Sequence, residues 1–195
     1  MSETFSTNRL HPGDPLPDFA LPDAGGTIHR LADRAGKPVV VCFACNHCPF
    51  VVHLAGALGQ LAGEYADRVA FFAINSNDAV NYPEDAPSRM AGFARKHGWH
   101  FPYLVDESQA VARAYGAACT PDFFLADAAG RLVYTGQFDS SRPSAYARKA
   151  APLDGRDLRA ALDAALEGAQ PPSPQRPSSG CNIKWKPGNE PDWYP

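Results

Sequence analysis

The chain has 195 residues, of which 45% are hydrophobic and 20% charged, with a formal net charge of −3. This length and composition predict one globular domain, and the slightly acidic balance argues against a nucleic-acid-binding surface. The sequence contains no apolar run near the roughly 18 residues of a membrane span, and residues 1–10 lack the pattern of a secretory signal. We therefore expect a cytoplasmic protein that binds neither nucleic acid nor membrane.

The first predicted elements are a hairpin, a buried strand and a helix. Residues 19–21 and 27–31 flank a Gly-containing turn, which predicts a β-hairpin. Residues 38–44 (PVVVCFA) are apolar throughout, as is typical of a central strand covered on both faces. From about 49 to 67 the apolar residues recur at helical spacing, so that Pro49 must lie in the first turn.

The remaining elements alternate between strand and helix. Asp106 and Gln109 resemble a capping box that opens a helix ending at Gly116. Leu153, Asp154 and Asp157 are predicted to start the last helix by a hydrophobic staple and an N-cap, and Gly168 to end it. The other predicted elements are strands at 69–74 and 101–105, a helix at 87–97, and a hairpin of 122–126 with 132–136.

This order predicts an α/β fold with a central, mostly parallel sheet flanked by helices. The N-terminal hairpin precedes the sheet, and the closing hairpin adds an antiparallel edge. Residues 1–169 form the predicted domain, and residues 170–195 form an extension. Its first ten residues read as a Pro/Ser linker, and the aromatic remainder is expected to pack back on the domain.

Three of the five cysteines lie within seven residues, at positions 42, 45 and 48. The odd, low count argues against a secreted disulfide scaffold, and clustered cysteines in a reducing cytosol are catalytic or metal-binding. The string Cys45-Asn46-His47-Cys48 lies between a predicted strand and a predicted helix. We therefore look for the function in this CxxC segment.

The start of a helix favours thiolate chemistry. Its unpaired N–H groups and partial positive charge stabilise a thiolate, which is the nucleophile in disulfide exchange. We predict that Cys45 attacks a substrate and that Cys48 resolves the mixed disulfide. Asn46 and His47 are predicted to modulate the pair, because a cationic imidazole would favour the thiolate of Cys45.

A zinc-stabilised binding module is the non-enzymatic alternative. One CxxC supplies only two of the four ligands of a structural zinc site. His47, Cys119 and Cys181 could complete the set only through the fold. We predict no metal and no other cofactor.

The dipeptide Thr120-Pro121 lies between a predicted helix and a predicted strand. It is a candidate cis peptide, although the residues alone fit an ordinary trans proline that opens a strand. A cis-proline backbone opposite the CxxC segment would present free N–H and C=O groups with which an extended substrate could pair.

These features together resemble the thioredoxin superfamily. The opening PGDPLPDFALPDAGG resembles the redoxin group, the AhpC/TSA and TlpA-like proteins. The strings CNHCPFV, CTPDFFL and GCNIKWK are similar to a subgroup of bacterial thioredoxin-like proteins. The resemblance implies a thioredoxin-like fold, with Cys45 as nucleophile, Cys48 as resolving cysteine, Pro121 as cis-proline and Thr120 as a substrate contact.

Two reactions fit this resemblance. The first is thiol–disulfide exchange with protein or small-molecule partners. The alternative is a thiol peroxidase that consumes hydroperoxides with Cys45 as peroxidatic cysteine. Peroxiredoxins carry Pro-x-x-x-Thr-x-x-Cys, but Cys42 stands here at the threonine position, and only Arg142 and Arg148 offer themselves as the partner arginine. Because of these mismatches, exchange through Cys45 and Cys48 is the preferred prediction. The strand 38–44 lacks the buried acid that thioredoxins carry before the CxxC, which leaves open how the proton leaves Cys48 and favours a dedicated partner over a general thioredoxin role.

Cys119 and Cys181 are further candidates for redox chemistry. Cys119 is next to Thr120, and Cys181 follows a linker that can span roughly 30 Å. The alternative for Cys181 is that it anchors the tail with Ile183 and Trp185. The sequence does not fix the oligomeric state.

Overall fold

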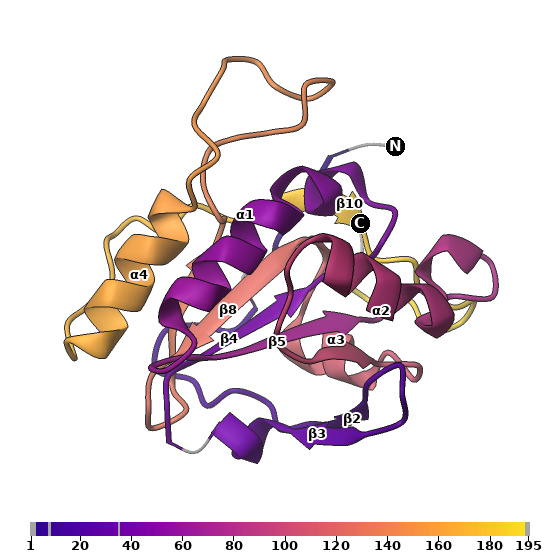
Figure 1. Ribbon diagram of the computed structural model, residues 1–195, viewed down its shortest axis with the longest axis horizontal. Coiled ribbons are helices and arrows are strands. Elements are labelled where there is room, and N and C mark those ends of the chain that lie inside the picture. The colour runs from indigo at the N-terminus through magenta and orange to yellow at the C-terminus, as the bar shows by residue number, and fades with distance from the viewer. Residues whose placement is uncertain (1–2, 8, 35, 194–195) are drawn as a thin grey trace.

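The computed structural model describes residues 3–7, 9–34 and 36–193 (Figure 1). The extreme ends of the predicted domain and tail, residues 1–2 and 194–195, lie outside this part. A five-stranded sheet forms the centre in the order β6-β5-β4-β8-β9. Its strands are β4 (Val39–Phe43), β5 (Ala70–Asn75), β6 (Tyr103–Val105), β8 (Asp122–Ala126) and β9 (Leu132–Gly136).

Strand β4 lies in the middle of this sheet because both of its faces are covered. It runs parallel to β5 and antiparallel to β8. Successive side chains of a strand point to opposite faces, so its apolar residues divide between two cores. Val40 and Cys42 pack into one hydrophobic cluster, while Val41 and Phe43 pack into the other. The prediction of a central, fully buried strand is confirmed.

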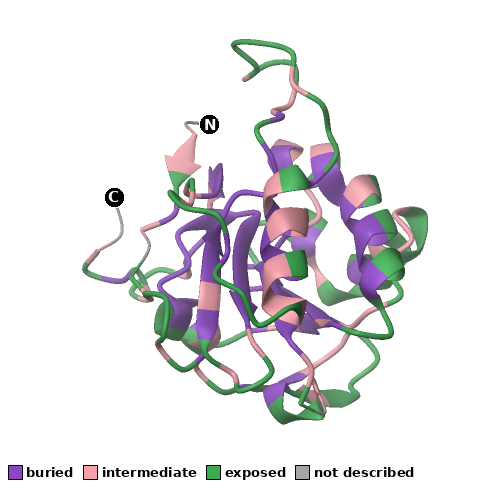
Figure 2. Ribbon diagram, turned by 90° about the vertical axis from the view of Figure 1, so that its left-hand side faces the viewer, coloured by how far each residue is buried: buried purple, intermediate pink, exposed green. Residues whose placement is uncertain are grey.

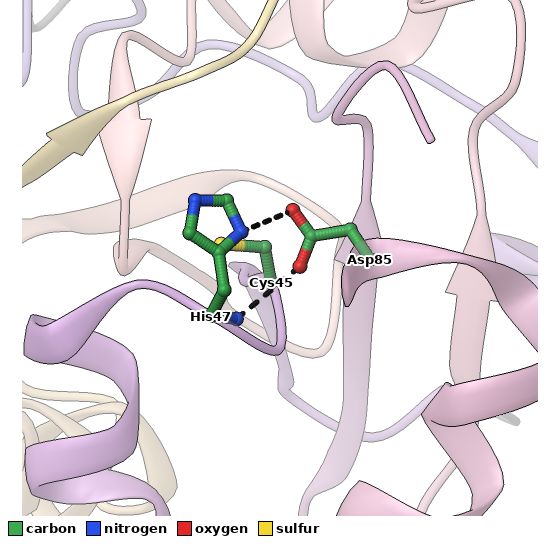
Figure 3. Close-up of side chains that lie close together, drawn as sticks. All are labelled: Cys45, His47 and Asp85. Carbon is green, nitrogen blue, oxygen red and sulfur yellow. Dashed lines mark hydrogen bonds and ion pairs between the residues drawn. The ribbon is translucent and has the colours of Figure 1, made fainter. Parts of the chain in front are cut away.

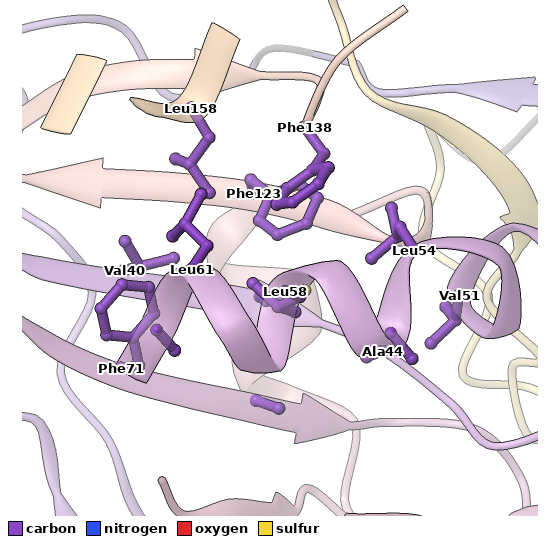
Figure 4. Close-up of a cluster of buried hydrophobic side chains, with 14 of the residues drawn as sticks. Val40, Ala44, Val51, Leu54, Leu58, Leu61, Phe71, Phe123, Phe138 and Leu158 are labelled. Atoms are coloured by element: carbon purple, nitrogen blue, oxygen red, sulfur yellow. The ribbon is translucent and has the colours of Figure 1, made fainter. Parts of the chain in front are cut away.

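Helices cover both faces of the sheet. On one face α1 (Pro49–Tyr65) and α4 (Arg156–Leu166) lie side by side, and α2 (Pro87–Lys96) continues that layer (Figure 1). Leu54, Leu58 and Leu61 of α1 enter the core between the sheet and α4 (Figure 4). The other face is covered by α3 (Ala110–Tyr115) and the N-terminal segment. Figure 2 shows the buried strands between these layers. None of the helices within the described ranges has the length and hydropathy of a membrane span.

A small hairpin extends the second layer, as predicted. Strands β2 (Ala20–Pro22) and β3 (Ile28–Arg30) are antiparallel, and η1 (Leu31–Arg34) follows them. The turn between them is held by Asp23, whose Oδ1 accepts the backbone N–H of Gly25 at 2.8 Å.

A second small sheet is not predicted by the sequence pattern. It joins β1 (Thr4–Phe5), β10 (Ser179–Asn182) and β7 (Cys119–Thr120), all antiparallel. The C-terminal segment thus lies beside the residue that precedes Pro121. The linker before it runs along β9, where Arg176 O accepts the backbone N–H of Gln137 at 2.9 Å.

The caps predicted for α3 and α4 differ from those in the structure. Gln109 precedes α3 in a left-handed conformation, and its side-chain amide donates to Lys184 O at 2.9 Å, so the glutamine binds the tail. Asp106 instead bonds the backbone N–H of Ala112. At α4 the N-cap is Gly155, again left-handed, but the predicted Asp154 still accepts the backbone N–H of Arg156 through Oδ1 at 3.2 Å.

Candidate active site

The CxxC segment connects the end of β4 to the start of α1. Residue 48 is the N-cap of α1, and Pro49 opens the helix because its missing N–H is not needed there. The free N–H groups and the positive end of the helix dipole therefore act at Cys48, with Cys45 lying before the helix. Both cysteines are free thiols, and neither exposes any surface.

The peptide Thr120–Pro121 is cis and lies against both thiols. Thr120 Oγ1 is 3.4 Å from Cys45 Sγ, and Cys48 Sγ donates to Thr120 O at 3.0 Å. The two thiols are also hydrogen-bonded to each other. The fold thus brings together the nucleophile, the resolving cysteine and the cis-proline loop that the resemblance implies.

A third thiol belongs to this group. Cys181 of β10 is 1% exposed and lies in the same buried cluster as Cys45 and Cys48. Its register partner across the small sheet is Thr120. We call Cys45, Cys48 and Cys181 the thiol cluster.

Hydrogen bonding within the thiol cluster shifts the pKa values of its three thiols in different directions. Burial raises the pKa of Cys45, and its hydrogen bond to Cys48 raises it further. Burial also opposes ionisation of Cys48, but hydrogen bonds from the thiols of Cys181 and Cys45 outweigh it and lower the pKa of Cys48 below its ordinary value. Donating that bond raises the pKa of Cys181. The stabilised thiolate expected at Cys45 from the sequence stays a prediction; the helix terminus itself lies at Cys48.

Asp85, at the end of η2 (Pro83–Asp85), organises the CxxC turn and was not identified from the sequence. Its carboxylate is fully buried. Oδ1 accepts the backbone N–H groups of Asn46 at 2.8 Å and His47 at 3.2 Å. Oδ2 accepts a hydrogen bond from the ring Nδ1 of His47 at 2.7 Å (Figure 3). It also accepts one from the side-chain amide of Asn77 at 2.7 Å. One carboxylate therefore fixes both the turn and the imidazole beside Cys45.

The residues between the cysteines are both held in place. The hydrogen bond to Asp85 raises the pKa of His47 above its ordinary value, although partial burial opposes this. The ring of His47 stacks on that of Tyr82 at 5.9 Å between centroids. Asn46 donates its side-chain amide to Glu84 O at 3.0 Å and accepts the Tyr103 hydroxyl at 3.2 Å.

Cys45, His47 and Asp85 also offer one ligand atom each within 4.8 Å of one another. However, both oxygens of Asp85 already accept two hydrogen bonds each, from Asn46, His47 and Asn77. A metal ion would have to displace the bonds that shape the turn. The donor set fits an organising carboxylate better than a metal ligand.

Cys42 and Cys119 have different neighbours. Cys42 Sγ is 3.7 Å from Phe43 O, and Cys119 Sγ is 3.6 Å from Pro121 O. Burial raises the pKa of both thiols, and the charge of Asp122 raises it further. Asp122 is itself fully buried, and burial raises its pKa to about 7. The buried acid that 38–44 lacks therefore lies on the neighbouring strand, in register with Phe43.

The two arginines considered for a peroxide site make no described hydrogen bond to a thiol, although Arg142 lines a cavity that also contacts Pro121 and Phe50. Arg142 donates to Ser141 O at 2.7 Å and to Gln137 Oε1 at 2.9 Å. With Arg148 it lines a surface hollow beside Tyr146. Neither arginine has a described contact with the thiol cluster.

Sheet order, the CxxC turn and the opposed cis-proline define a thioredoxin-like protein. A crystal structure of a hypothetical protein from Sinorhizobium meliloti superposes with a TM-score of 0.90 and 48% identity, covering 95% of this chain and all of that one. Residues 12–135 match the model of the AhpC/TSA family, so the chain belongs to the AhpC/TSA family.

Two curated relatives carry names from the two expected reaction classes. The thiol–disulfide oxidoreductase ResA of Geobacillus thermodenitrificans is 31% identical over 62% of this chain and 66% of its own length. The peroxiredoxin Bcp of Escherichia coli is 28% identical over 70% of this chain and 90% of its own length. The thioredoxin-superfamily and redoxin resemblance stated from the sequence is confirmed.

Proposed function

We propose that this protein is a thiol–disulfide oxidoreductase that works through Cys45 and Cys48. The observation that carries the proposal is the pair of hydrogen-bonded thiols at the start of α1, both in contact with Thr120 of the cis-proline loop. The name and alignment of ResA support it.

The hydrogen bonds suggest how the pair starts the reaction. Once Cys48 has lost the proton that its thiol donates to Thr120 O, the proton of Cys45 can pass to Cys48 and leave a thiolate on Cys45. The imidazolium of His47, held by Asp85, lies within 4.8 Å and stabilises that charge. His47 is thus the positioning residue that makes the buried Cys45 a nucleophile.

Exchange then proceeds in two balanced steps. The thiolate of Cys45 attacks one sulfur of a partner disulfide, a Cys45–partner disulfide forms, and the other partner sulfur leaves as a thiolate that takes up the proton that Cys48 had received. Cys48, again a thiolate, attacks Cys45 Sγ and releases the second partner sulfur as a thiolate, which takes up a proton from water. The partner is reduced by two electrons, and the Cys45–Cys48 dithiol becomes a disulfide.

We propose protein or small-molecule disulfides as partners and the cytoplasm as the compartment. Because Cys45 exposes no surface, a partner reaches it only when neighbouring side chains move. A reducing cytosol would return the oxidised site to the dithiol. The choice of partner, its electron donor and the oligomeric state are left to experiment.

A thiol peroxidase is the second candidate because Bcp is a relative. In that reaction the Cys45 thiolate attacks a hydroperoxide, becomes a sulfenic acid and releases water or an alcohol. Cys42, at the threonine position of the peroxiredoxin pattern, packs in the core and is 2% exposed. Hydroperoxide consumption faster than that of an ordinary thiol would favour this candidate.

An equilibrium redox titration with mass mapping of each oxidised sample tests the proposal. A Cys45–Cys48 disulfide with a potential between roughly −270 and −120 mV is expected. Cys45→Ser should abolish exchange, and Cys48→Ser should trap a mixed disulfide on Cys45. If both variants exchange at the wild-type rate, the proposal is wrong.

A further inference from the structure

Strand β10 occupies the backbone edge that the cis-proline loop would offer to an extended peptide. Cys181 pairs with Thr120 and Asn182 with Cys119, antiparallel. The approach is close, since a Cβ on Gly180 would lie 1.9 Å from Thr120 O. Such an edge is the usual place for an added peptide strand. Here the chain's own C-terminal segment fills it and brings a cysteine.

The register directs that cysteine toward the active thiols. Side chains of directly opposed residues lie on the same face of an antiparallel pair. Cys181 therefore shares a face with the Thr120 side chain, whose hydroxyl is 3.4 Å from Cys45 Sγ. The carbonyl oxygen of Thr120, the residue opposite Cys181, lies 3.0 Å from Cys48 Sγ, so the register brings Cys181 beside Cys48.

Bonds on both sides of Cys181 hold it there. Before it, Ser178 O accepts the backbone N–H of Ser6 at 2.9 Å, and Ser178 Oγ donates to Gly136 O at 2.7 Å. After it, the backbone N–H of Ile183 donates to Ala118 O at 3.1 Å, and that of Lys184 to Asn77 Oδ1 at 2.9 Å. The third thiol is therefore held against Cys48.

We propose that Cys181 is a third redox thiol, which takes over the disulfide from Cys45–Cys48 by forming a Cys48–Cys181 disulfide. The inference rests on the proposed function, because the Cys45–Cys48 disulfide is its starting point. Cys181 loses its proton, and its sulfur attacks Cys48 Sγ. The Cys48–Cys181 bond forms, the Cys45–Cys48 bond breaks, and Cys45 leaves as a thiolate that takes up that proton. No electrons are gained or lost overall.

As a result Cys45 becomes a thiol again, while the protein still carries one disulfide, now between Cys48 and Cys181. Cys45 can then accept a second partner, or an external dithiol can reduce the Cys48–Cys181 disulfide. Cys119 does not share this geometry, because it alternates with Thr120 on the short strand β7. Its predicted redox role stays a prediction.

Tryptic peptides distinguish the two disulfides. Trypsin does not cut before Pro38 or Pro177, so Cys45 and Cys48 share the peptide 35–68 and Cys181 lies in the peptide 160–184. A Cys48–Cys181 disulfide links the two peptides, whereas a Cys45–Cys48 disulfide leaves them separate. The full-length protein is equilibrated with glutathione and glutathione disulfide, alkylated and digested.

The cross-link is expected in the wild type and in Cys45→Ser, and its loss is expected in Cys48→Ser and in Cys181→Ala. Peptide 114–131, which carries Cys119, should never join 160–184. Circular dichroism of each variant checks that the fold is kept, and Cys42→Ala serves as a matched control that keeps the cross-link.

The outcomes distinguish a failure of the inference about Cys181 from a failure of the proposed function. No cross-link in either the wild type or Cys45→Ser overturns the inference, and a cross-link that survives in Cys48→Ser removes Cys48 as the partner of Cys181. If a Cys45–Cys48 disulfide still forms in Cys181→Ala while the wild type shows no cross-link, the proposed function stands without the third thiol. If that disulfide forms in none of the proteins, the proposed function itself fails.

Discussion

The thiol cluster and the pair Cys42 and Cys119 differ in neighbours rather than in burial. All five sulfur atoms are buried. In the thiol cluster the three thiols lie in one buried cluster and an imidazole lies beside Cys45, although burial and the charge of Asp85 raise the pKa of Cys45. Around Cys42 and Cys119 the charged neighbour is the carboxyl group of Asp122, which raises the pKa of both. Reactivity therefore depends on which groups share the buried space, because only some of them can hold a thiolate.

The largest expected effect is on the rate of disulfide exchange, which should distinguish the thiol cluster from Cys42 and Cys119. Cys45→Ser should lower the rate of disulfide exchange by about 10³-fold or more, because a hydroxyl does not replace the thiolate. Cys42→Ala should stay within about threefold of the wild type. Reduction of a fluorescent glutathione disulfide measures both rates. Equal losses in the two variants would contradict the distinction.

Asp85→Asn should disturb the turn that carries Cys45. The variant loses a fully buried carboxylate with four hydrogen bonds, which should lower the free energy of unfolding by about 2–4 kcal/mol. It should also return the pKa of His47 toward its ordinary value. Urea unfolding measures the first effect, and an NMR titration of the imidazole measures the second.

The pH dependence follows from the sign of the His47 shift. A raised pKa in the folded protein means that the contribution of the imidazolium is fully present below pH 6.5 and is lost as the pH rises through the raised value. The stability difference between wild type and Asp85→Asn should therefore shrink at high pH. A difference that does not change with pH would show that the carboxylate acts on the backbone alone.

Gly180→Ala tests whether the close strand keeps Cys181 in the thiol cluster. The added Cβ would meet Thr120 O, so β10 must shift, at a cost of about 1–3 kcal/mol. Cys181 should then react faster with a thiol reagent such as a coloured aromatic disulfide. Gly92→Ala, in a helix with open space around it, is the matched control; it should leave the reactivity of Cys181 unchanged and raise stability by up to about 1 kcal/mol.

The smallest effect on disulfide exchange concerns Asp122, beside Cys42 and Cys119. Since its pKa is raised from 3.8 to about 7 by burial, the folded state is destabilised as the pH rises from about 4 through 7. Asp122→Asn should match the wild type near pH 4 and exceed its stability by about 4 kcal/mol at pH 8, because the shift is about three pKa units at about 1.4 kcal/mol each. The exposed Asp67→Asn serves as control. A constant difference at all pH values would contradict the assignment.

The sequence predicts the central sheet and the CxxC turn because their signals are local. The continuous apolar run of β4 and the helical spacing of Leu54, Leu58 and Leu61 place both elements within a residue or two of their observed bounds. The cis-proline loop follows from the family resemblance. In each case the residues that decide the element lie next to one another in the chain.

The rest of the site depends on contacts between distant segments. Strand β10 has four residues, SGCN, with no apolar alternation, and it forms only because β1 and β7 lie on either side. Asp85 lies in a short loop that gives no catalytic motif, and its role appears only when the fold brings it under Asn46 and His47. Gln109 is recruited by the tail, which overrides the local capping pattern.

The redox role proposed for Cys181 depends on the register in which β10 pairs with Thr120. A slip by one residue would place Gly180 or Asn182 opposite Thr120 and would exchange the thiol for hydrogen or for an amide. The thiol's own hydrogen bond is too weak to prevent this alone. The backbone hydrogen bonds of Ser178 and Lys184, on either side of Cys181, thus fix the register of β10 and determine which side chain lies opposite Thr120.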